Sequence, residues 1–260
     1  MKKALFVVIL GMVLLLAGCF QSHRIINVNK DGSGTIVEMF LLSSELGKKP
    51  GGESTYHDVE QLKSDASKYG EGVKYVSSKA VHKNSLKGYE VTYSFPDIEK
   101  LTIAEDAAGE MMDMGMGSSV QDNLSFKFHK GKKAKLEIIF PKEEMEETPE
   151  DMEWEDEEME EITDEEQQQA MQMAQTLYAD MEVSTKIVVN GTITDSDADH
   201  INGNEIILQE IIFAELMKDE KSVLLMKKME EMQPTQMENM MMDFPGVKAE
   251  TKDKVTLEFK

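Results

Sequence analysis

The clearest signal in the chain is a strict alternation of apolar and polar positions over several short stretches. Tyr89, Val91, Tyr93 and Phe95 alternate with polar residues, which is typical of a half-buried β-strand. Two apolar runs, 25–28 and 35–37, flank the sequence Asp31-Gly32-Ser33-Gly34. A Gly-rich turn between two such runs predicts a β-hairpin.

The same alternation returns in the second half of the chain. It predicts strands over 124–128 and 134–138, joined by a turn at Gly131, and a closing strand over 255–259. Weaker apolar runs predict further strands at 73–81, at 187–193 and at 205–208. The strand-rich pattern with short connections favours a mostly antiparallel sheet.

Helical periodicity marks a smaller part of the sequence. Val59, Leu62, Ala66 and Tyr69 form one apolar stripe, with Ser54 or Thr55 as the expected N-cap and Gly70 just past the C-terminus. Thr163 opens a capping box for another amphipathic helix, and 211–217 and 223–232 are also expected to be helical. The predicted fold class is therefore α+β: a mostly antiparallel sheet covered by amphipathic helices, with a disordered acidic insertion.

Composition divides the chain into segments. We expect a removed leader at 1–18, a lipidated tether at 19–24, a hairpin-helix-strand unit at 25–103, a Met/Gly-rich linker or loop at 104–123, and a second α+β unit at 124–260. Within the second unit, 13 of the 20 residues of 142–161 are Asp or Glu, against one Lys. Self-repulsion and the lack of apolar periodicity predict that this segment is disordered.

The N-terminus carries the most specific motif. Lys2 and Lys3 precede the apolar run 4–16, and Ala17-Gly18 precede Cys19, the only cysteine. This arrangement resembles the lipobox of bacterial lipoprotein precursors. The resemblance implies a diacylglyceryl group on the Cys19 thiol, cleavage before Cys19, and Cys19 as the mature N-terminus. Phe20 follows the cysteine in place of Asp, the usual inner-membrane retention residue in enteric bacteria.

The localisation expected from this motif is the cell envelope. In a Gram-negative host we expect the periplasmic face of the outer membrane, and otherwise the outer face of the cytoplasmic membrane. After Cys19 no run of 18 apolar residues occurs, so no second membrane span is expected.

A softer resemblance covers about residues 25–101. The sequences Lys30-Asp31-Gly32-Ser33-Gly34, Gly70-Glu71-Gly72-Val73 and 93–101 (YSFPDIEKL) are similar to those of an uncharacterised family of bacterial cell-envelope lipoproteins. That resemblance implies an α+β fold and brings no activity or ligand with it.

Charge and cysteine content exclude several classes. Without the leader the chain has 26 Lys and Arg against 50 Asp and Glu, a net charge of −24. Such a chain repels nucleic acids and anionic lipid headgroups, so nucleic-acid binding is disfavoured and membrane association needs the covalent anchor at Cys19. With that cysteine lipidated, no internal disulfide can form.

Methionine suggests a metal alternative. The clusters Met111, Met112, Met114, Met116 and Met240, Met241, Met242 resemble copper-handling segments, because thioethers are soft ligands that suit Cu(I) or silver. Methionine is also spread along predicted helices and through the acidic segment, which favours its use as a flexible apolar filler.

Two acidic loops imitate hard-cation sites. Residues 29–36 match the start of an EF-hand loop, but Phe40 stands where the bidentate Glu is needed, so a tight hairpin turn is the better interpretation. Asp195, Asp197 and Asp199 alternate, but His200 stands at the Gly position, which favours a solvated loop.

No catalytic motif is recognisable in the sequence: the five histidines are scattered and the familiar nucleophile and phosphate-binding patterns are missing. We therefore expect a non-enzymatic, lipid-anchored binding or scaffolding module without a cofactor. Its partner would be a protein or a small ligand, and the alternative is a soft-metal-binding lipoprotein.

Overall fold

The computed structural model describes residues 20–43, 57–104, 123–141, 180–216, 218 and 244–260. The predicted leader 1–18 and Cys19 lie outside these residues. So do most of the Met/Gly-rich segment 104–123, the acidic segment 142–161, and the predicted helices that begin at Thr163 and at Val223.

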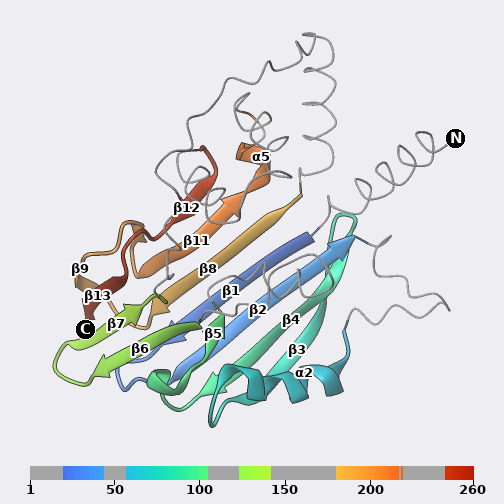
Figure 1. Cartoon of the computed structure of the whole chain (residues 1–260). Helices are drawn as coiled ribbons and strands as arrows, with labels where there is room; N and C mark the ends of the chain where they lie inside the picture. The colour runs from blue at the N-terminus through green and yellow to red at the C-terminus, as the bar shows by residue number, and fades with distance from the viewer. Residues whose placement is uncertain (1–19, 44–56, 105–122, 142–179, 217, 219–243) are drawn as a thin grey trace, which may run out of the picture.

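The larger sheet has eight strands and combines both halves of the chain (Figure 1). Its main path runs β10-β11-β8-β1-β2-β4-β3, and β12 also pairs with β11. β1 and β8 are parallel, whereas the other pairs are antiparallel. The strands are β1 (Phe20–Val28), β2 (Gly34–Ser43), β3 (Lys74–Lys83), β4 (Leu86–Phe95), β8 (Glu182–Val189), β10 (Ile201–Asn202), β11 (Glu205–Ile212) and β12 (Val247–Ala249).

The smaller sheet has five strands in the order β5-β6-β7-β13-β9. These strands are β5 (Ile103–Ala104), β6 (Asn123–His129), β7 (Ala134–Ile139), β9 (Ile193–Ser196) and β13 (Lys254–Phe259). β6, β7 and β13 bury every second residue, as the alternating sequence predicts. The hairpins predicted at 25–37 and 124–138 are confirmed.

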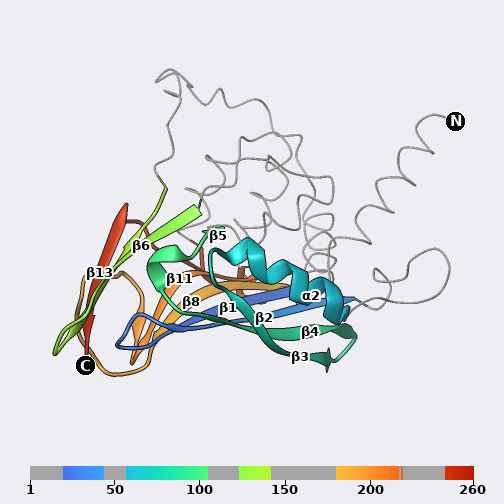
Figure 2. The same cartoon turned by 90° about the horizontal axis from the view of Figure 1, so that it is seen from below.

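One hydrophobic core lies between the two sheets. Ile26 and Ile187 of the larger sheet are fully buried in the same cluster as Leu136 and Val255 of the smaller sheet. Figure 2 shows β6 and β13 rising at an angle from one face of the larger sheet. Within the described residues, a second sheet and one short helical segment cover this face, so the expected cover by several amphipathic helices is not supported. Alternation shows that each strand has one buried face, but it does not say whether a helix or another sheet covers that face.

A short helical segment covers part of the same face beside the smaller sheet (Figure 2). α2 (Val59–Asp65) continues into the 3-10 turn η1 (Ala66–Tyr69), and Leu62, Ala66 and Tyr69 are buried as predicted. The N-cap is Asp58, not Ser54 or Thr55, because its carboxylate accepts hydrogen bonds from the free backbone N–H groups of Glu60 and Gln61. Gly70, with φ 115°, ends the segment.

The remaining described helices are short. The 3-10 turn η2 (Ile98–Lys100) is capped by Asp97, and the Ile98 N–H donates to the Gly32 carbonyl. α5 (Phe213–Leu216) is one turn long. A helix was expected over 211–217, but Ile211 and Ile212 continue β11 and pair with β8. A continuous apolar run fits a buried strand as well as a helix.

The chain does not divide as the composition suggested. Residues 20–24, expected to be a tether, are the first part of β1 and pair with both β2 and β8. The expected units 25–103 and 124–260 contribute strands to one sheet and side chains to one core.

Candidate functional site

The strongest predicted site residues lie outside the described part of the chain. These are the lipidation residue Cys19 and the methionines of the soft-metal alternative, Met111, Met112, Met114, Met116, Met240, Met241 and Met242. Lipidation and soft-metal binding therefore remain predictions. What the structure does place is the residue after Cys19, because Phe20 opens β1.

The EF-hand-like sequence forms the β1–β2 turn. Asp31 Oδ1 accepts hydrogen bonds from the Ser33 N–H (3.0 Å) and the Ser33 hydroxyl (2.6 Å), which lower the pKa of this carboxyl. Gly32 has φ 84° and its N–H donates to the Asn29 carbonyl. The carboxylate is thus used to shape the loop, and the predicted tight hairpin turn is confirmed.

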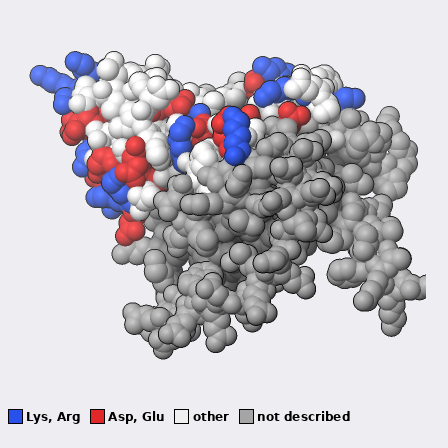
Figure 3. All heavy atoms as spheres, turned by 90° about the horizontal axis from the view of Figure 1, so that it is seen from above, with Lys and Arg blue, Asp and Glu red and all other residues white. Residues whose placement is uncertain are grey.

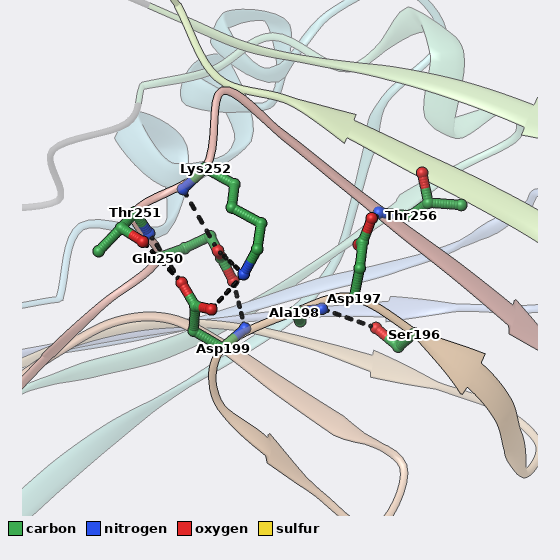
Figure 4. A network of polar contacts seen from close by, with 8 residues as sticks. All are labelled: Ser196, Asp197, Ala198, Asp199, Glu250, Thr251, Lys252 and Thr256. Carbon is green, nitrogen blue, oxygen red and sulfur yellow. Dashed lines mark hydrogen bonds and ion pairs between the residues drawn. The ribbon is translucent and has the colours of Figure 1, made fainter.

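The acidic loop at 195–199 is held to the connection between β12 and β13 by a polar network (Figure 4). Asp197 Oδ1 accepts from the Thr256 N–H (2.6 Å), and Asp199 Oδ2 accepts from the Thr251 hydroxyl (2.8 Å). Glu250 Oε2 accepts from the Asp199 N–H (2.9 Å). Asp195, Asp197 and Asp199 are exposed, as predicted for a solvated loop, and these hydrogen bonds also hold the loop to the rest of the fold.

A lysine occupies the position between two of these carboxylates. Lys252 Nζ donates to Asp199 Oδ1 and lies 3.5 Å from Glu250 Oε1 (Figure 4). Its ammonium is the main cause that holds the pKa of Asp199 far below its usual value, whereas burial raises the pKa of Glu250. Among the residues that the structure describes, no group of three or more His, Cys, Asp or Glu could hold a metal ion.

A buried polar row crosses the core-facing side of the larger sheet. Arg24 shares a face of β1 with Ile26 and Val28 and is only 3% exposed. Its cross-strand partners are Glu38 on β2 and Thr185 on β8, and Thr185 in turn faces Gln209 on β11. The row therefore places a charged pair and two polar side chains where the alternation predicts apolar residues.

Glu38 ends this row on β2 and accepts hydrogen bonds from two donors. Its Oε1 accepts from Arg24 Nε at 2.6 Å, and its Oε2 accepts from the Tyr69 hydroxyl of η1. The Tyr69 ring lies 6.0 Å from the Arg24 guanidinium carbon. Among the residues that the structure describes, Thr185 Oγ1 and Gln209 Oε1 are buried and have no hydrogen-bond partner. Sequence reasoning missed the row, although Arg24 lies in register with Ile26 and Val28 and could have been found by that spacing.

On the opposite face of β1, a histidine joins a serine and a glutamate. His23 Nδ1 lies 2.8 Å from Ser184 Oγ, and His23 Nε2 lies 3.4 Å from Glu182 Oε2. Burial is the main cause that lowers the pKa of His23. A serine, a histidine and a carboxylate in line can activate a nucleophile. Here Ser184 is only 4% exposed within a central strand, so the geometry joins β1 to β8 and leaves its hydroxyl little room for a substrate.

The end of the larger sheet next to Cys19 has its own apolar cluster. Phe20 and Val183 are buried there, with Leu42 and Met181 packed against them. The Lys83 ammonium at the β3–β4 turn donates to Gln21 Oε1 at 3.0 Å. The start of β1 and the β3–β4 turn therefore both lie at this end.

Charge is unevenly divided along the chain. The described residues carry 20 Lys and Arg against 21 Asp and Glu, so nearly all of the net charge of −22 belongs to the rest of the sequence. Figure 3 shows both signs interspersed on one face of the described part. The electrostatic repulsion expected from the whole composition therefore does not come from the sheets. Within the described ranges, no helix is long and apolar enough to cross a membrane.

Comparison with known proteins gives one distant structural similarity. No protein-family model matches the sequence, and no curated protein matches it. The NMR structure of the folded domain of LppM from Mycobacterium tuberculosis is similar over 94% of this chain and 91% of that chain, with 9% identity and a TM-score of 0.35. A TM-score this low carries no conclusion about the fold or function of this chain.

Proposed function

We propose that this protein is a lipid-anchored lipoprotein of the cell envelope, attached through acyl chains on Cys19. The observation that carries the proposal is the basic, apolar and small-residue sequence that ends at this cysteine. The position of β1 supports it, because this strand begins at Phe20, directly after the cysteine. Cleavage before Cys19 would leave the whole described fold intact.

We further propose that the folded part acts as a binding or scaffolding module for a protein or small ligand, not as an enzyme. The arrangements closest to catalytic chemistry support this choice. The Ser184 hydroxyl is buried between strands, and Asp197 and Asp199 accept hydrogen bonds from the neighbouring loop and from β13. Reactive groups need access to a substrate, whereas these side chains connect parts of the fold.

The test is expression of the unmodified chain and the Cys19→Ala variant in a bacterial host. The unmodified protein should partition into the detergent phase and should yield an acylated N-terminal peptide that begins at Cys19. The variant should remain an uncleaved and unacylated precursor. A variant that is still cleaved at this position and still partitions as a lipoprotein would contradict the proposal.

A further inference from the structure

We propose that the end of the larger sheet at Phe20 rests against the bilayer, so that the domain stands upright on the membrane without a tether. The inference rests on the proposed lipidation of Cys19. It concerns the orientation of the domain and the surface that meets the lipid, which lipidation alone does not fix. A lipoprotein with a flexible linker could adopt any orientation.

The proposed anchor residue lies directly next to the ordered sheet. Phe20 pairs with Leu42 in the ladder between β1 and β2, and Gln21 pairs with both Leu41 and Glu182. Consecutive Cα atoms are about 3.8 Å apart. The Cα of the lipidated residue therefore lies within about 4 Å of an ordered sheet, with strands on both sides of β1 to hold its direction.

The second step is the set of residues that share this end. In the β-ladders, Leu42 faces Lys87 of β4, which in turn faces His82 of β3. Lys87 and His82 are exposed, as are the turn residues Asn84 and Ser85. The β3–β4 turn thus presents a cation and small polar groups beside the anchor. Such a surface suits phosphate headgroups, which attract lysine side chains near the interface.

The third step is the opposite end of β1. Nine residues at about 3.3 Å each place the β1–β2 turn about 30 Å from Phe20. Asn190, which follows β8, donates its backbone N–H to the Val28 carbonyl and its side chain to Asn29. Phe128 of the smaller sheet lies against Gly32. The turns after β1, β6 and β8 therefore gather at the end farthest from the anchor.

The fourth step is charge. The described residues are almost neutral in sum, so the two sheets themselves do not repel a bilayer that contains anionic lipids.

The experiment uses the full, lipidated protein in phospholipid vesicles, with one new cysteine for a fluorophore. Lipidation blocks the Cys19 thiol, so only the new cysteine reacts. Ser85→Cys places the label in the exposed β3–β4 turn at the anchored end, and Lys132→Cys places it in the exposed β6–β7 turn at the far end. Quenching by lipids that carry a spin label on the headgroup reports the distance of each fluorophore from the membrane surface.

We expect strong quenching of the label at position 85 and little at position 132. Equal quenching at the two positions, or stronger quenching at 132, would overturn the upright orientation. Vesicle flotation and the mass of the N-terminal peptide are measured on the same samples. Protein that neither floats nor carries acyl chains refutes the proposed function, whereas acylated, floating protein without the quenching difference refutes only the orientation.

Discussion

Replacing Glu38 with Leu should destabilise the fold far more than the loss of an ordinary surface charge. Glu38 accepts from both Arg24 Nε and the Tyr69 hydroxyl, and its side chain is 15% exposed. The substitution removes the carboxylate that balances the positive charge of Arg24, whose side chain is only 3% exposed. Breaking one partner of a buried ion pair costs about 3–5 kcal/mol, so we expect a loss of that size in the free energy of unfolding.

The assay is urea unfolding of the detergent-solubilised protein, followed by far-ultraviolet circular dichroism. With a slope of about 1–3 kcal/mol per molar urea, the midpoint should fall by more than about 1 M. Glu60→Ala is the matched control, because Glu60 also pairs with a lysine but its side chain is 83% exposed. The control should cost at most about 1 kcal/mol.

A double variant separates the charge from the packing. Arg24→Leu combined with Glu38→Leu removes both charges, and apolar replacements of a buried pair are often neutral or stabilising. We therefore expect the double variant to be more stable than Glu38→Leu alone. A loss below about 1 kcal/mol for Glu38→Leu, or a double variant less stable than the single one, would refute the reasoning.

Three further outcomes are expected. Thr185→Val keeps the shape of the side chain but removes a buried hydroxyl that has no partner among the described residues. The free energy of unfolding should therefore rise by about 1 kcal/mol. A decrease of that size would show that the hydroxyl has a partner. Burial lowers the pKa of His23 below its usual 6.5, so its contribution to stability is complete above pH 6.5 and declines as the pH falls. His23→Asn should flatten the dependence of the urea midpoint on pH between 7 and 5, and an unchanged slope would contradict this. In a titration against a competing chelator, we expect no Cu(I) binding by the unmodified protein; competition that disappears when leucine replaces Met111, Met112, Met114 and Met116 would establish the soft-metal alternative.

The strands were predictable because a half-buried strand leaves a period of two in the sequence. Phe126 and Phe128 on β6, and Leu136 and Ile138 on β7, show that period and are buried as expected. The layer that covers them was not predictable, because alternation shows which face of a strand is buried but not which element packs against that face. Ile211 and Ile212 could likewise not be assigned, since a short continuous apolar run fits both a strand and a helix.

The polar features depended on contacts between distant residues. Asp199 and Lys252 are 53 residues apart in sequence, and no local pattern shows that they meet. Arg24 was assigned to a tether because the lipobox directed attention to the anchor, although its spacing from Ile26 placed it on the core-facing side of a strand. Lipidation of Cys19 stays a prediction, and it rests on local sequence alone because signal peptidase reads a local motif and no folded contact is needed to define that motif.

The mature protein should begin at an acylated Cys19 and continue directly into the sheet. The mass of the N-terminal peptide, released from membranes of cells that express the unmodified chain, tests this most directly. We expect a peptide that begins at Cys19 and carries the added mass of diacylglyceryl and fatty acyl chains. A peptide that begins elsewhere, or one that begins at Cys19 with an unmodified thiol, would contradict it.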